Sequence, residues 1–223
     1  MIINKKFNYQ KLEKAEGPNG DRVYMSPKGY ALPSVTTILS ATEDKTGLIA
    51  WRERVGDKKA DQIRDESCAL GSLMHNFLEN HIMQVPHRVG TNPIRITASN
   101  MANQIINREF QNINEIWGIE AGLFYDGLFA GTTDLVGVYN NKPAIMDYKT
   151  SKALKTIDKI ENYMCQLSAY CMAHDDLYGT NIKQGVIFMV TRNLEFKTFV
   201  IEGDDFDHYR DKWLSRLEQY YNK

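Results

Sequence analysis

The sequence predicts an α/β or α+β domain with a mixed central β-sheet flanked by helices. Three observations support this fold class. Apolar residues recur with helical spacing up to about residue 116, they alternate with polar residues along three segments from residue 118, and helical and strand patterns then alternate. The order from residue 118 is β-β-β-α-β-β-α, and an N-terminal hairpin and helical extension precede it. The expected division is therefore an N-terminal hairpin and helical region at residues 1–117, followed by a sheet-forming core at 118–223.

The N-terminal part is expected to hold a small hairpin and several helices. Residues 22–25 and 29–32 flank the turn signal "SPKG" and predict the hairpin. Ser34 is a suitable N-cap for the helix that "SVTTIL" opens. The helical segments expected after it are 46–83, as two helices, and about 97–116, separated by a loop at 84–93.

Strands and helices alternate in the second part of the chain. The first three strands are joined by short turns, and Asp204 or Asp205 is a suitable N-cap for the closing helix. The expected strands are 118–126, 128–139, 142–150, 184–191 and 194–201, and the expected helices are about 157–177 and 204–221.

Charge and cysteine content exclude several classes of protein. The chain carries 27 basic and 28 acidic residues, which argues against a globally basic nucleic-acid binder and leaves room for a local basic patch. Cys68, Cys165 and Cys171 are odd in number and form no CxxC pair, so we expect reduced thiols in a cytoplasmic protein. The sequence has no signal-peptide pattern and no run of ~18 apolar residues, which predicts a soluble chain with no membrane partner.

The stretch "PAIMDYKTSK", residues 143–152, carries charged residues at the end of an apolar strand. A two-residue turn at Asn140 and Asn141 would pair Asp134 with Asp147, and opposite Cβ atoms lie about 4.5–5.5 Å apart. Two carboxylates at that distance repel, and a divalent cation such as Mg²⁺ would resolve the conflict. Lys149 projects from the same face about 6.6 Å further along. From spacing alone, a structural ion pair that caps the sheet is an equally good interpretation, and a three-residue turn would shift the register.

Two further residues are weak candidates when each is taken alone. His75 lies on a predicted helix beside an apolar stripe, with Glu79 four residues later on the same face, and a satisfied boundary histidine is the commoner interpretation. Glu120 fits a solvent-facing strand glutamate as well as it fits a site residue. The absence of an HExxH motif argues against a zinc protease.

Taken together in chain order, the motifs resemble a known family. His75 on a helix, "GTTD" ending at Asp134, "DYK" at 147–149 and "QLSAY" at 166–170 are similar to the PD-(D/E)XK nuclease superfamily, in its RecB-like exonuclease branch. Upstream, "LPSVTTIL", "WRERVG" and "LGSLMH" resemble segments of phage-type exonucleases and of the mitochondrial genome maintenance exonuclease group. The resemblance covers about residues 20–200 and implies a restriction-endonuclease-like core.

The resemblance also implies roles for individual residues. His75, Asp134 and Asp147 would be metal ligands, with the backbone carbonyl of Tyr148 as a fourth, and Lys149 would be the catalytic lysine. The metal would be Mg²⁺ or Mn²⁺, and no iron–sulfur cluster is expected because the four cysteines that hold one are missing. The remaining residues that the resemblance places at the site are Gln166, Tyr170 and, less securely, Glu120.

The implied function is a metal-dependent deoxyribonuclease that hydrolyses phosphodiester bonds as an exonuclease. We expect it to act on single-stranded or free DNA ends in phage or bacterial recombination, repair or replication, with a single-strand-binding or recombination protein as partner. The DNA contacts would come from Lys152, Lys155, Arg52 and Ser151, although a lysine run is more often a solvated face. The alternatives are a catalytically inactive DNA-binding accessory factor and a structure-specific or restriction-type endonuclease of the same fold.

Overall fold

The computed structural model describes residues 2–18 and 20–222. In chain order the elements are β1 (Ile2–Ile3), β2 (Glu13–Glu16), β3 (Arg22–Met25), β4 (Ala31–Pro33), α1 (Val35–Ala41), α2 (Thr46–Val55), α3 (Asp57–Ile82), α4 (Pro93–Glu109), η1 (Phe110–Asn112), β5 (Ile113–Tyr125), β6 (Phe129–Tyr139), β7 (Lys142–Ser151), η2 (Ile157–Ile160), α5 (Glu161–Tyr178), β8 (Gln184–Thr191), β9 (Phe196–Glu202) and α6 (Gly203–Tyr221). In the described ranges, no helix is long and apolar enough to cross a bilayer.

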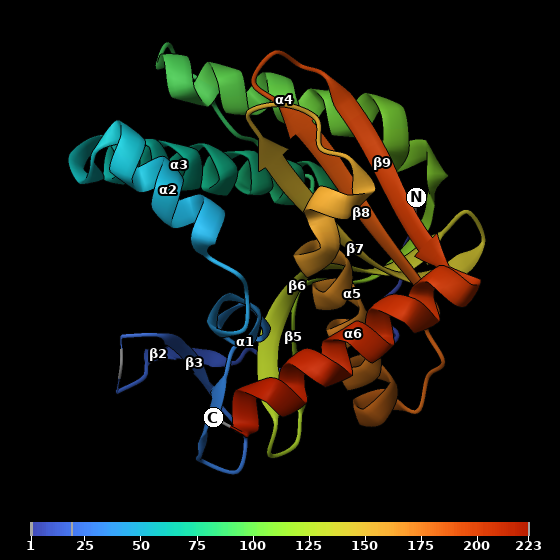
Figure 1. The fold of residues 1–223 in the computed structure, drawn as a ribbon. Helices are drawn as coiled ribbons and strands as arrows, with labels where there is room; N and C mark the ends of the chain where they lie inside the picture. The colour runs from blue at the N-terminus through green and yellow to red at the C-terminus, as the bar shows by residue number, and fades with distance from the viewer. Residues whose placement is uncertain (1, 19, 223) are drawn as a thin grey trace.

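The main sheet is mixed and has the strand order β1-β5-β6-β7-β8-β9, which confirms the predicted fold class. The β1–β5 and β7–β8 pairs are parallel and the others antiparallel, and α5 makes the crossover from β7 to β8. Figure 1 shows α3 and α4 on one face of this sheet and α5 and α6 on the other. Along the strands the core residues alternate accordingly: Met146 and Phe188 pack with α3 and α4, whereas Ile145 and Ile187 pack with α5 and α6.

The turn between β6 and β7 has the predicted two-residue form. Asn140 and Asn141 have φ angles of 48° and 64°, and Tyr139 pairs with Lys142. Asparagine tolerates this left-handed conformation, so the turn sets the register of the hairpin. The ladder continues to Leu135 opposite Met146, and Asp134 and Asp147 are the next residues on the two strands.

Several predicted boundaries were wrong. The helix predicted over 97–116 begins at Pro93, because Asn92 caps it by accepting a hydrogen bond from Ile94 N at 2.9 Å and proline fits the first helical turn. It ends at Glu109. Strand β5 consequently begins at Ile113, five residues before the predicted start. The closing helix begins at Gly203, and Asp204 and Asp205 lie in its first turn rather than at the cap. Ser34, in contrast, caps α1 as predicted, with its Oγ accepting from Thr37 N at 2.9 Å.

The predicted N-terminal hairpin forms β3 and β4 of a separate three-stranded sheet, β2-β3-β4, which we call the small sheet. Its third strand, β2, was not predicted. The small sheet packs on β6 through Tyr24 and Leu32, which form a cluster with Leu12 and Ala130. In Figure 1 it lies across from α2 and the N-terminal part of α3.

The first residues of the chain join the main sheet instead. Ile2 pairs with Glu115 and Ile3 with Ile116, so β1 forms the edge of the sheet beside β5. The division of the chain at residues 117 and 118 stays a prediction, and β5 runs through that point.

Candidate active site

Three adjacent strands carry the carboxylates of the site. Asp134 lies on the central strand β6, and Asp147 follows the last hydrogen-bonded pair of the β6–β7 hairpin. On the other side, the pairs Ile119–Leu135 and Ala121–Thr133 place Glu120 of β5 opposite Asp134. The sheet therefore gathers Glu120, Asp134 and Asp147 from separate parts of the chain.

His75 reaches this row from α3 and contacts two acceptors. Its Nε2 lies 3.1 Å from the carbonyl oxygen of Tyr148, and its Nδ1 lies 3.3 Å from Oδ1 of Asp134. Burial alone would lower the pKa of His75, but the charge of Asp134 outweighs it and raises the pKa to about 9. These two acceptors therefore favour the charged form of His75, in which both ring nitrogens can donate.

The second oxygen of Asp134 fixes the neighbouring strand. Oδ2 accepts a hydrogen bond from the backbone N–H of Tyr148 at 2.7 Å. Although burial opposes ionisation, the charge of His75 and these hydrogen bonds hold the pKa of Asp134 below its usual value. The Tyr148 ring is buried between His75 and Phe188, so only its backbone faces the site.

A set of donor atoms suited to a divalent cation is present. Within the described part of the chain, ligand atoms of His75, Glu120 and Asp134 all lie within 4.8 Å of one another, and the Asp147 carboxylate is directed to Lys149 instead. One imidazole nitrogen and two carboxylates fit Mn²⁺ or Mg²⁺. The sequence analysis named Asp147 as the third side-chain ligand, whereas the structure places Glu120 beside His75 and Asp134.

Glu120 combines an unusual backbone with a perturbed carboxyl group. Its φ is 47°, in the left-handed region that residues with a Cβ rarely adopt. Loss of hydration and then the charge of Asp134 raise the pKa of Glu120 to about 7. Strained residues of this kind often occur at functional sites.

Lys149 is held on the α5 side of the site. It forms an ion pair with Asp147, donates to Gln166 Oε1 at 3.2 Å, and lies 4.9 Å from the centre of the Tyr163 ring. Burial would lower the pKa of Lys149, but Asp147 and Asp134 outweigh it and raise the pKa. Lys149 is therefore a cation at neutral pH. Tyr163 was not predicted as a site residue, and its position on α5 before Gln166 is the only sequence signal for it.

Gln166 and Tyr170 continue this chain of contacts along α5. Gln166 Nε2 donates to the hydroxyl of Tyr170 at 3.3 Å, and both side chains are buried. The Tyr170 ring packs against Gly131, where an added Cβ would lie 2.6 Å from the Tyr170 hydroxyl. The glycine of "GTTD" thus provides the space for Tyr170, a requirement that the motif alone did not reveal.

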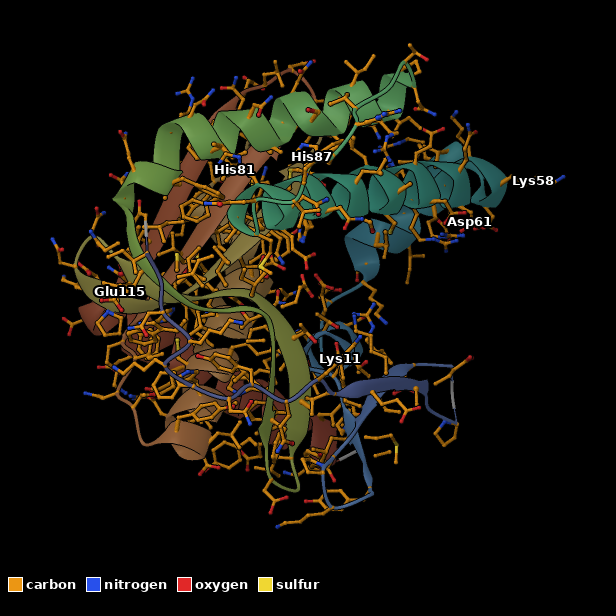
Figure 2. All side chains as sticks on the ribbon, turned by 180° about the vertical axis from the view of Figure 1, so that it is seen from behind. Lys11, Lys58, Asp61, His81, His87 and Glu115 are labelled. Carbon is orange, nitrogen blue, oxygen red and sulfur yellow. The ribbon has the colours of Figure 1, made fainter. Side chains whose placement is uncertain are left out.

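The predicted DNA contacts differ in their surroundings. Arg52 is engaged by Asp57 at 2.8 Å and Asp61 at 3.1 Å, near the outer end of α3, where Figure 2 labels Asp61. The hydroxyl of Ser151 donates to Ala153 O at 2.7 Å, Lys155 lies 5.1 Å from the Tyr163 ring, and Lys152 is exposed. Lys155 therefore shares the Tyr163 ring with Lys149, whereas Arg52 is paired with carboxylates.

The other histidines of α3 and the loop after it lie away from the site. Figure 2 shows His81 and His87 towards the far end of α3, beside α4. Their rings contact Phe110 and Phe77, with centroids 5.6 and 4.9 Å apart. These contacts give both histidines a packing role.

A cavity of about 470 Å³ lies over His75, Glu120 and Asp134, which we call the candidate metal-binding cluster. His75, Glu120 and Asp134 form one side of it, and Lys14, Arg22 and Tyr24 of the small sheet contribute the other. The sequence did not mark Lys14 or Arg22 as site residues, because nothing local connects them to residues 75–134.

Comparisons with known proteins point to one nuclease family. A family model described as the PD-(D/E)XK nuclease superfamily matches residues 53–223. Mitochondrial genome maintenance exonuclease 1 of Xenopus tropicalis is 28% identical over 205 residues, which is 86% of this chain and 58% of that protein. The Homo sapiens protein of the same name is 23% identical over 204 residues, which is 86% of this chain and 59% of that protein. The chain thus spans less than two thirds of the length of these relatives.

A solved structure shows the same fold. The crystal structure of a protein described as a candidate exonuclease from Eubacterium rectale superposes with a TM-score of 0.53 and 14% sequence identity. The match covers 70% of this chain and 65% of that chain.

Proposed function

The chain belongs to the PD-(D/E)XK nuclease superfamily, and from this premise we propose that it is a metal-dependent DNA exonuclease. The observation that carries the proposal is the position of Lys149: a partly buried cation is held beside Asp147, next to a cluster of His75, Glu120 and Asp134. Hydrolysis of a phosphodiester needs an oriented water and stabilisation of negative charge on the phosphate. The two halves of this site supply the groups for both.

His75, Glu120 and Asp134 would hold the metal, with Asp147 and the Tyr148 carbonyl adjoining as the ligands that the sequence also suggests. A bound Mg²⁺ or Mn²⁺ would neutralise phosphate charge and lower the pKa of a bound water. The histidine makes Mn²⁺ more acceptable than it is in an all-oxygen site.

Lys149 would act as a cation and hydrogen-bond donor rather than as a base. Its raised pKa keeps the proton on Nζ at neutral pH, so Lys149 can orient the attacking water or stabilise charge on the phosphate oxygens. Asp147 and Gln166 fix the direction of the ammonium group, and Tyr170 in turn fixes Gln166. Gln166 and Tyr170 are positioning residues in this scheme.

We propose single-stranded or free DNA ends as the substrate, in phage or bacterial recombination, repair or replication. The support is the resemblance of the motifs and the two lysines that follow Lys149 closely in the chain, Lys152 and Lys155. A cytoplasmic location stays a prediction, since the two vertebrate relatives carry a mitochondrial name.

The proposal is tested with end-labelled single-stranded DNA. Mg²⁺ or Mn²⁺ should support the release of nucleotides, and EDTA, Asp147→Ala or Lys149→Ala should abolish it while circular dichroism stays unchanged. Asp205→Ala is the matched control, because Asp205 is an exposed carboxylate in the first turn of α6. Full activity in the Asp147→Ala protein would overturn the assignment.

A closed circular single strand separates the alternatives. An exonuclease should leave it intact while it degrades the linear form. Equal degradation of both would indicate an endonuclease of the same fold. Binding of linear DNA without cleavage in either metal would indicate the inactive accessory factor.

A further inference from the structure

The small sheet presents one defined face to the cavity over the metal-binding cluster. In the β2–β3 ladder Lys14 pairs with Tyr24 and Glu16 with Arg22, so Lys14, Tyr24 and Arg22 share a face. Tyr24 is buried, and its hydroxyl accepts a hydrogen bond from Thr132 Oγ1 at 3.5 Å. Because Thr132 lies two residues before Asp134 on β6, this contact fixes the face beside the site.

Two cations on this face have no carboxylate partner among residues 2–18 and 20–222. Lys14 and Arg22 are exposed, and neither forms an ion pair there, even though Glu16 lies opposite Arg22. Both residues line the cavity of about 470 Å³, together with Glu79, Glu120 and Asp134. A cation left without a partner beside a metal-binding cluster is suited to an anion that the metal also contacts.

We propose that Lys14 and Arg22 bind backbone phosphates of the DNA strand next to the scissile phosphate. The two residues are diagonal neighbours on paired strands, a spacing of about 7–8 Å, which suits neighbouring phosphates of one strand. Lys149 is not among the residues that line this cavity, so the strand would be held from two sides of the metal site. The inference rests on the proposed function and extends it, because both residues lie outside the matched range 53–223.

The competing explanation is that Lys14 and Arg22 only offset the negative charge of the site. Lys14 does lower the pKa of Glu120 through its charge. In that case removal of the two cations would tighten Mn²⁺ binding and leave the phosphate contacts unchanged.

Salt-dependent DNA binding distinguishes the two explanations. The affinity of an oligothymidylate with a 5′-hydroxyl end, which has only backbone phosphates, is measured by fluorescence anisotropy in Ca²⁺ between 50 and 300 mM KCl. Each phosphate contact on a single strand contributes about 0.7 to the slope of log K against log salt. The Lys14→Gln/Arg22→Gln double variant should therefore show a slope shallower by about 1.4 and an affinity about 25-fold weaker at 0.1 M salt.

Lys28→Gln is the matched control, since Lys28 belongs to the turn of the small sheet and pairs with Asp126 away from the cavity. Its slope should equal that of the wild type. An unchanged slope in the double variant, or an equal drop in Lys28→Gln, would overturn the inference. Urea unfolding of each variant confirms that the fold is retained.

A cleavage assay of the wild-type protein distinguishes failure of this inference from failure of the proposed function. Cleavage of linear DNA by the wild type, together with an unchanged slope in the double variant, overturns only the role of Lys14 and Arg22. A wild type that neither binds nor cleaves DNA overturns the proposed function itself.

Discussion

Replacing Glu120 with glycine is expected to stabilise the metal-free protein while weakening its affinity for Mn²⁺. The φ of 47° at Glu120 costs a residue with a Cβ about 1–2 kcal/mol, and glycine removes that cost. Glycine loses more conformational freedom on folding, which costs about 0.5–1 kcal/mol. The net increase in the free energy of unfolding is therefore about 0.5–1 kcal/mol. Most substitutions destabilise, so the sign of this effect is itself diagnostic.

The matched control is Glu120→Gln, which removes the charge beside Asp134 but keeps the Cβ and the strained backbone. In urea unfolding with EDTA, the free energy of unfolding of Glu120→Gly should exceed that of Glu120→Gln by about 0.5–1 kcal/mol. Calorimetric titration with Mn²⁺ should show both variants weakened by at least about tenfold. If Glu120→Gly is no more stable than Glu120→Gln, the argument from backbone strain is wrong. Unchanged Mn²⁺ affinity in both variants would instead show that Glu120 is not a ligand.

Three further predictions concern the α5 side of the site and the core beneath it. Lys149→Met should lower single-turnover cleavage by about 10²–10³-fold at saturating protein, because it removes a positioned cation, and a rate like that of the wild type would contradict this role. Gly131→Ala should destabilise the protein by about 1–3 kcal/mol in thermal unfolding, since the new Cβ lies 2.6 Å from the Tyr170 hydroxyl, and adding Tyr170→Leu should recover part of the loss if that contact is the cause. Burial lowers the pKa of His174 from 6.5 to about 4, so the folded state disfavours its charged form. The free energy of unfolding should therefore fall as the pH drops from 6.5 towards 4, by about 2 kcal/mol at pH 5. His174→Asn should show a shallower decrease between pH 7 and pH 5 in urea unfolding, and equal decreases in the two proteins would refute the assignment.

The β6–β7 hairpin was predictable because its determinants are local. Asn140 and Asn141 supply the turn, the turn sets the register, and the register brings Asp134 and Asp147 to adjacent positions. The "DYK" and "QLSAY" motifs then sit on a strand and on the helix that follows it. These relations depend on residues close in sequence, so a pattern can reveal them.

Glu120 could not be placed with the same certainty. Its position depends on the β5–β6 register, in which bulges occur between Ile113 and Glu115 and between Ile116 and Gly118. A bulge changes which residues lie opposite each other without any clear sequence signal. The position of Glu120 beside His75 and Asp134 is therefore revealed only by the three-dimensional structure.

The small sheet was predicted only in part for a different reason. Strand β2 consists of "EKAE", and all four residues are exposed, so no alternation of apolar and polar residues marks it. The contact of Tyr24 with Thr132 joins residues 108 apart in sequence. No local pattern predicts which strand a polar hairpin will pack against.

The pairing of β1 with β5 has a consequence for the order of folding. Asn4 contacts Glu115 across 111 positions of the chain, and closing a loop of that length costs about 4 kcal/mol of entropy. The two residue pairs between β1 and β5 offset little of this entropy loss. We therefore expect β1 to dock only after β5, β6 and β7 have assembled. Until then the backbone groups at the edge of β5 are open to pairing with another molecule. Refolding at high protein concentration should therefore be most vulnerable to aggregation at this edge of β5.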